Sequence, residues 1–180
     1  MIRSIRNCAV VALPTCLGRA RRVRWLDSAR WLALSGLVMV LDQASKSLIT
    51  GAFKLGESLK VNSFFDLVLV LNRGAAFSFL SDAGGWQRWF FIVLATAISA
   101  WIVRMIIGHA SERLLSTALA LVLGGALGNV IDRLQHGAVV DFLYFHVAEY
   151  YWPAFNLADS AITVGVALLL WQQWRPGVKS

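Results

Sequence analysis

Charged residues are scarce in this chain of 180 residues. Aspartate, glutamate, lysine and arginine make up only 15% of it, whereas hydrophobic residues make up 58% and the mean hydropathy is +0.63. About a quarter of the residues of a typical soluble domain are charged. This shortage excludes an ordinary soluble domain and predicts an integral membrane protein.

The chain has only two cysteines and three histidines. Neither residue type shows a pattern typical of a metal site. Both cysteines, Cys8 and Cys16, lie within residues 1–30, and we expect them to be reduced and without function. His109, His136 and His146 show no spacing typical of metal ligands, and no serine stands in a GxSxG motif. We therefore expect no metal, no cofactor and no serine nucleophile.

Four apolar stretches approach the length of a membrane-spanning helix, which is about 20 residues. They cover residues 31–50, 88–107, 113–131 and 157–174. Gly124 and Gly128 form a GxxxG motif in the third stretch, which predicts close packing against a neighbouring helix. The sequence therefore predicts an all-α membrane protein, with four transmembrane helices in one domain over residues 31–174.

The placement of lysine and arginine predicts the orientation of these helices. Cations precede the first stretch, flank the short turn between the second and third, and follow the fourth, whereas those in the two longer loops are more dispersed. Because cytoplasmic flanks carry the excess of lysine and arginine, we expect both termini, including a tail over residues 175–180, to be cytoplasmic. The loops 51–87 and 132–156 would then be extracytoplasmic.

Residues 1–30 form a basic segment that contributes much of the net charge of +7. A basic segment beside a membrane helix is more typical of contact with anionic lipid than of nucleic-acid binding. We expect a disordered or interfacial cytoplasmic extension, with membrane lipid as its partner and no nucleic acid.

The first long loop has the pattern of strands. LKVN (59–62) and FFDLVLVLN (64–72) are rich in valine, leucine and phenylalanine, and a turn signal follows at 72–74. We predict a small extracytoplasmic β-sheet between the first and second helices, within residues 51–87. The alternative is an irregular loop.

Polar residues gather at the extracytoplasmic end of the predicted bundle. Asp42 and Lys46 are four positions apart, so they share one helix face. Asn129, Asp132 and Arg133 share a face near the end of the third stretch in the same way. An intrahelical ion pair and capping of a helix end are the local explanations that remain open.

Two further aspartates lie at the same depth. Asp159 follows Asn156 by three positions, the spacing of a capping box, so a purely local role remains open. Asp141 stands in the apolar run VVDFLYF with no helix end to cap. Because carboxylates near hydrocarbon are costly, they are interpreted as functional by default.

A pair of aspartates has a definite chemistry. Two carboxylates a few ångströms apart do not both ionise readily, so they share one proton. One then acts as a base toward water while the other polarises a carbonyl. Such a pair hydrolyses peptide bonds without a metal.

The motifs together resemble a known family. DQASK (42–46), NRGAAFS (72–78), GGALGNVIDR (124–133), VVDF (139–142) and FNLADS (155–160) occur in this order and are similar to those of bacterial lipoprotein signal peptidase (signal peptidase II), a four-helix intramembrane aspartic peptidase. The resemblance covers residues 36–174. The basic extension over residues 1–30 is longer than we expect for this family.

The resemblance implies an activity and a site. It implies removal of signal peptides from diacylglyceryl-modified prolipoproteins, just before the lipidated cysteine, by a catalytic pair formed by Asp141 and Asp159. It also implies a β-cradle over residues 51–87, a gating loop before the fourth helix, and a site near the extracytoplasmic face of the bacterial inner membrane. Separately, we expect a monomer. The supporting or substrate-binding residues that the resemblance implies are Asp42, Lys46, Asn72, Arg73, Gly74, Gly128, Asn129, Asp132, Arg133, Asn156 and Ala158.

Two other functions remain as alternatives. Carboxylates inside membranes also build proton relays, so a small proton-linked channel or transporter is one. A noncatalytic assembly factor is the other, and it predicts that substitutions of the acids are silent.

Overall fold

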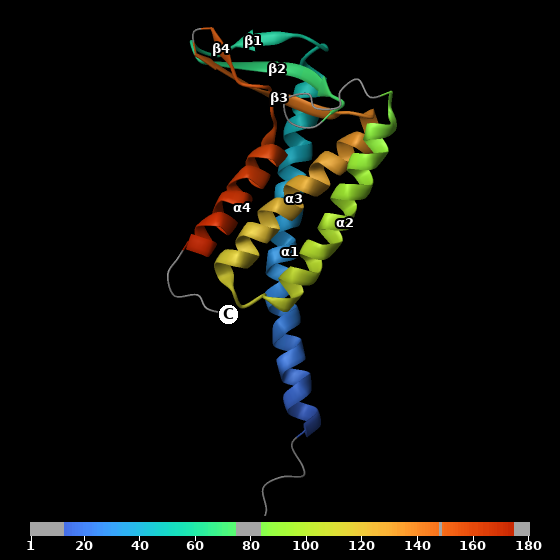
Figure 1. Cartoon of the computed structure of the whole chain (residues 1–180), viewed down its shortest axis with the longest axis vertical. Helices are drawn as coiled ribbons and strands as arrows, with labels where there is room; N and C mark the ends of the chain where they lie inside the picture. The colour runs from blue at the N-terminus through green and yellow to red at the C-terminus, as the bar shows by residue number, and fades with distance from the viewer. Residues whose placement is uncertain (1–12, 75–83, 148, 175–180) are drawn as a thin grey trace, which may run out of the picture.

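The computed structural model describes residues 13–74, 84–147 and 149–174. The helices lie side by side, and an antiparallel sheet lies across one end of them (Figure 1). We call this the sheet end. In chain order the elements are α1 Leu13–Ala52, β1 Ser58–Lys60, β2 Phe65–Asn72, α2 Trp86–Gly108, α3 Arg113–His136, β3 Val139–Val147, β4 Tyr150–Tyr151 and α4 Leu157–Trp174.

Helix α3 is the centre of the bundle, since it packs against α1, α2 and α4. The buried apolar core joins Ile102 and Ile106 of α2 to Leu119 and Leu123 of α3. Large apolar side chains on the outward faces are exposed instead; Trp101, for example, is 59% exposed. Such apolar outer faces are the surfaces that lipid covers in a membrane protein.

Glycines allow α3 to lie close to its neighbours. A Cβ at Gly124 would lie 2.6 Å from the carbonyl oxygen of Ser35 in α1, and a Cβ at Gly125 would collide with the backbone of Ala158 in α4. Small residues at such contacts let helix backbones approach within membranes. The close packing predicted from the GxxxG motif is confirmed.

Three helical segments are long and apolar enough to cross a membrane: Asp27–Ala52, Trp86–Gly108 and Arg113–His136. The 18 residues of α4 include the polar pair Asp159 and Ser160 in the first turn and two glutamines in the last turn, and these four residues lower the mean hydropathy of the helix. The prediction of a fourth membrane span therefore stays a prediction.

The first helix starts earlier than predicted. We expected it to begin at residue 31 after a disordered or interfacial segment, but α1 begins at Leu13 and is 40 residues long, so that boundary is wrong. Its N-terminal part projects beyond the other helices (Figure 1). The bundle proper begins near Trp31, whose indole N–H donates to the Ala110 carbonyl oxygen at 2.9 Å. The residues of the basic segment can also form a helix, so α1 extends through them. The prediction used the apolar stretch alone, and that stretch covers only the part of α1 that packs against the other helices. Residues 1–12 and 175–180 lie outside the described residues.

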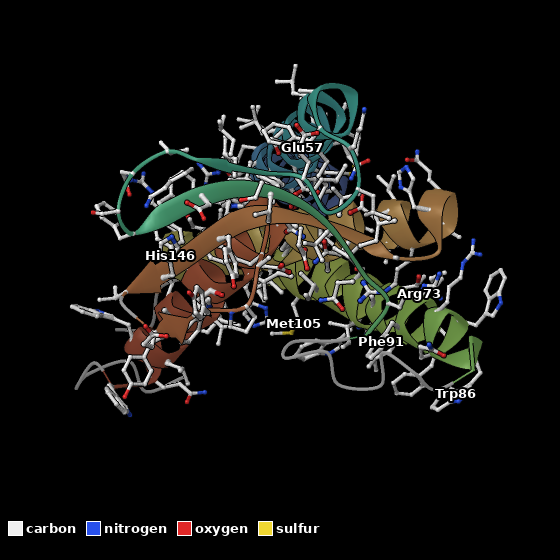
Figure 2. All side chains as sticks on the ribbon, turned by 90° about the horizontal axis from the view of Figure 1, so that it is seen from above. Glu57, Arg73, Trp86, Phe91, Met105 and His146 are labelled. Atoms are coloured by element: carbon white, nitrogen blue, oxygen red, sulfur yellow. The ribbon has the colours of Figure 1, made fainter. Side chains whose placement is uncertain are left out.

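The sheet draws strands from both long loops, which corrects the prediction that it lies within residues 51–87. β1 and β2 come from the first loop as expected, but β2 also pairs with β3, which pairs with β4, both from the second loop. Figure 2 shows the sheet from above, lying over the helices. A two-stranded hairpin alone is marginally stable, so the apolar run of β3 completes the sheet and fixes the second loop beside the first.

Candidate active site

Asp141 lies on β3, directly after α3. Helix α3 ends at His136, and the positive φ of 73° at the next residue, Gly137, turns the chain into the strand. Asp141 stands opposite Val70 of β2 and is only 2% exposed. The strand, which we did not predict, is what brings this carboxyl group over the end of the bundle.

Asp159 lies in the first turn of α4. Its backbone N–H donates to Asn156 Oδ1 at 2.9 Å, and the Asn156 N–H donates to Asp159 Oδ2 at 3.3 Å. This is the reciprocal capping arrangement that the spacing allowed. Asp159 has a second role, however, because its Oδ1 accepts a hydrogen bond of 2.8 Å from Asn129 Nδ2 on α3.

Asn156 joins the two aspartates. Its Nδ2 donates to Asp141 Oδ1 at 2.7 Å, while its backbone N–H donates to Asp159. The side chain is fully buried and also donates to the Val140 carbonyl oxygen at 3.2 Å. One rigidly held asparagine therefore fixes both carboxyl groups.

The environment of Asp141 favours its neutral form. Burial, followed by the nearby negative charge of Asp159, raises the pKa of Asp141 to about 7. The hydrogen bond of 3.2 Å from Asn72 Nδ2 to Asp141 Oδ2 acts in the opposite direction, because it stabilises the carboxylate. Asp141 therefore keeps its proton below about pH 7.

A buried ionic cluster lies beneath the two aspartates. Lys46 Nζ lies 2.8 Å from Asp42 Oδ2 and 2.7 Å from Asp132 Oδ2, and all three side chains are at most 4% exposed. The ion pair that the spacing of Asp42 and Lys46 left open is present, and Asp132 makes it a triad. Because a buried charge requires partners, each of the two acids depends on Lys46, and Lys46 depends on them.

This triad also orients the residue that bonds Asp159. Lys46 Nζ donates to Asn129 Oδ1 at 3.1 Å, and Asn156 Nδ2 donates to the same oxygen at 3.3 Å. With its oxygen held by two donors, Asn129 directs its NH₂ group to Asp159. Lys46 thus acts on Asp159 through Asn129.

The two acids of the triad also hold the backbones that carry the aspartates. Asp42 Oδ1 accepts from the Ala158 N–H at 2.9 Å, and Asp132 Oδ2 accepts from the Val140 N–H at 3.0 Å. Ala158 precedes Asp159 and Val140 precedes Asp141. A Cβ at Gly128 would collide with the carboxylate of Asp42, so this position needs glycine.

Arg133 extends from α3 toward the turn after β2. Its Nη2 donates to the Gly74 carbonyl oxygen at 3.0 Å, and its guanidinium lies 5.0 Å from the ring centre of Phe91. Asn72 Oδ1 in turn accepts from the Gly74 N–H at 3.0 Å. Within the described ranges, the buried Nε of Arg133 has no hydrogen-bond partner.

The structure departs from the predicted set at two positions. Arg73 lies beside the start of α2 and the end of α3, where it lines a separate cavity. Gln43, which the sequence analysis missed, donates to Asp132 Oδ1 at 2.8 Å and to the Gly128 carbonyl oxygen at 3.2 Å. The sequence did contain a signal for Gln43: a polar side chain in an apolar membrane helix often forms a hydrogen bond with a neighbouring helix.

Comparison with known proteins identifies the family. The model of the signal peptidase (SPase) II family matches residues 34–175. A lipoprotein signal peptidase of Azoarcus sp. (strain BH72) is 60% identical over 161 residues, which cover 89% of this chain and 92% of that protein. A lipoprotein signal peptidase of Cupriavidus necator is 57% identical over 145 residues, covering 81% and 83%.

A solved structure supports the same assignment. It is described as a bacterial membrane enzyme determined by the in meso method, and it superposes with a TM-score of 0.72 at 32% identity. The match covers 84% of this chain and 94% of that one. Since the family model, the relatives and the fold agree over most of the length, the chain belongs to the signal peptidase II family of membrane proteases.

Proposed function

We propose that this protein is an intramembrane aspartic endopeptidase that removes signal peptides from diacylglyceryl-modified prolipoproteins, cutting just before the lipidated cysteine. Membership of the family supports the substrate class. The observation that supports the aspartic mechanism is the bridge made by Asn156, which donates one hydrogen bond to Asp141 and another to Asp159.

The proposed reaction uses one proton shared by Asp141 and Asp159. The ionised carboxylate accepts a proton from water as the water oxygen attacks the scissile carbonyl carbon. The protonated carboxyl donates a hydrogen bond to the carbonyl oxygen, where negative charge develops. Collapse of the tetrahedral intermediate breaks the C–N bond, and the departing amine receives the proton from the pair.

The neighbouring polar groups position this pair in the proposal. Asn129 and Asn156 hold the two carboxyl groups, and the Lys46 triad holds the backbones on either side. Arg133 has an unpaired Nε among the described residues, which makes it suitable for binding a substrate carbonyl oxygen. The site needs no cofactor.

We further propose the membrane placement. All four helices span the bacterial inner membrane, both termini are cytoplasmic, and the sheet end is extracytoplasmic. A lipidated substrate would then enter sideways from the bilayer, so its peptide reaches Asp141 and Asp159 while its acyl chains stay in lipid. We also propose that a monomer suffices.

Cleavage without a metal is the first expected result. Purified protein in detergent or lipid should cleave a diacylglyceryl-modified prolipoprotein and should retain full activity with a chelator present. Electrophoresis of substrate and product measures the rate. Loss of cleavage with the chelator would contradict an aspartic mechanism. A well-folded protein that fails to cleave but conducts protons across liposomes would favour a proton-linked transporter instead.

The cleavage rate is expected to fall as the pH rises through about 7. The raised pKa of Asp141 means that the shared proton is present below that pH and is lost above it. Because the reaction needs one protonated and one ionised carboxyl group, the rate should approach a tenfold fall per pH unit on the alkaline side. Measurement of kcat/KM from pH 6 to 9 tests this, and a flat profile would contradict it.

Asn72→Ala provides the matched comparison for the pH profile. The hydrogen bond from Asn72 lowers the pKa of Asp141, so its removal should raise that pKa and move the fall in rate to higher pH. A purely structural role for Asn72 would reduce activity without moving the profile.

A further inference from the structure

A polar cavity lies at the sheet end, between the turn after β2, the start of α2 and the end of α3. Its volume is about 600 Å³, and its lining includes Arg73, Gln87, Arg88, Trp89, His136 and Gly137. The lining contains none of the residues of the ionic cluster or the aspartate pair. Nothing in the proposed peptidase mechanism uses this cavity.

The part of the lining that the structure describes is cationic. Arg73 and Arg88 supply two guanidinium groups and His136 an imidazole, from three separate segments, and none of the described lining residues carries a carboxylate. Guanidinium groups match phosphate oxygens in geometry and charge. A cavity of this composition therefore fits a phosphate group.

Arg88 is held in place with a donor to spare. Its Nη2 donates to the Leu134 carbonyl oxygen at 2.9 Å, which ties the side chain to the last turn of α3. Its Nε is buried and has no hydrogen-bond partner in residues 13–74, 84–147 and 149–174. Since buried donors are normally paired, an acceptor bound at the cavity would supply the missing partner.

The surroundings of the cavity favour a lipid as the source of the phosphate. The Arg88 guanidinium lies 5.2 Å from the ring centre of Trp89. Trp86 and Trp89 are 55% and 59% exposed at the sheet end of α2, a helix apolar enough to span a membrane. Figure 2 shows Arg73 on the same side of the sheet as Trp86. Exposed tryptophans at the end of such a helix mark the level of lipid headgroups.

We propose that this cavity binds the phosphate of an anionic lipid headgroup, with Arg73 and Arg88 as its ligands and His136 at its edge. The lipid headgroup would occupy this cavity beside α2. Its phosphate would contact both the turn after β2, through Arg73, and the start of α2, through Arg88, close to the end of α3. This site is separate from the aspartate pair and does not depend on the peptidase activity.

Lipid binding by the purified full-length protein tests the proposal. Short-chain phosphatidylglycerol, phosphatidylcholine of the same chain length, and inorganic phosphate are each titrated in a nonionic detergent while the thermal midpoint is recorded. Phosphatidylglycerol is expected to raise the midpoint at much lower concentration than the other two. Arg88→Gln and Arg73→Gln should each weaken its apparent affinity about tenfold, which corresponds to one lost charge-assisted hydrogen bond.

Arg104→Gln is the matched control, because Arg104 is an exposed arginine at the opposite end of α2. It should bind phosphatidylglycerol as the wild type does. If Arg88→Gln fails to fold, the affinity for phosphatidylglycerol is measured in Arg73→Gln and His136→Gln instead. Unchanged affinity in the folded variants would overturn the proposal, since binding would then lie elsewhere, for example at the basic segment 1–30. If inorganic phosphate raised the thermal midpoint at the same concentration as phosphatidylglycerol, the proposal that the bound phosphate belongs to a lipid would be wrong.

Discussion

Asp141→Asn is expected to slow prolipoprotein cleavage by at least about a thousandfold, the order of magnitude of a lost acid–base group. An asparagine keeps an oxygen that accepts the hydrogen bond from Asn156, so the local fold should survive. Its amide, however, neither shares nor transfers the proton. Asp159→Asn should have the same effect. Initial rates at pH 6, compared with the thermal midpoint of each variant, measure the loss apart from unfolding.

The double variant distinguishes a pair from two independent residues. If Asp141 and Asp159 share one proton, Asp141→Asn with Asp159→Asn should be no slower than either single variant, because groups that act as a unit are not additive. Asp66→Asn is the control on the same sheet: Asp66 lies on β2 near His146 and should tolerate the change within a few-fold. Activity retained by either single variant would refute the assignment.

Lys46→Met is expected to have the largest effect on stability. It removes the cation from between Asp42 and Asp132, which are almost completely buried, and leaves two like charges without the lysine that neutralises them. Breaking a buried pair in this way costs about 3–5 kcal/mol in the free energy of unfolding. The thermal midpoint in detergent should fall by roughly 10 °C, and Asn129 should lose its orientation toward Asp159.

Two variants make this prediction specific. Lys54→Met changes an exposed lysine just after α1 and should leave the midpoint unchanged. Adding Asp42→Asn to Lys46→Met removes one of the two carboxylates that have lost their cation. The double variant should therefore recover part of the lost thermal midpoint. If the single variant melted at the wild-type temperature and cleaved at the wild-type rate, the triad would not support the site.

Local patterns in the sequence pointed to several parts of the structure. The spacing of Asp42 and Lys46 left an ion pair open, and that of Asn156 and Asp159 left reciprocal capping open; the structure contains both. Both depend on the fixed geometry of one helical turn, so neither needs information about distant residues. The strands within 59–72 were predicted for a similar reason, since alternation and residue type act locally.

Other features depend on partners far apart in the sequence and were missed. β3 is such a case: VVDFLYF is apolar without periodicity, and only the edge of β2 makes it a strand. Gln43 is another, because its acceptors Gly128 and Asp132 lie on α3. Arg73, grouped by its motif with the site, lines a different cavity because the turn after β2 directs it toward α2.

By itself, the sequence determined the class of the protein, its apolar helices and its motifs, because hydropathy and residue spacing are local properties of the chain. The family follows from those motifs. Only the tertiary structure decided that Asn156 connects Asp141 with Asp159, that Lys46 serves two acids, and that Arg73 and Arg88 share a cavity. These contacts form because α3 packs against the other three helices and β3 pairs with β2, and the burial that results makes each unpaired polar group costly.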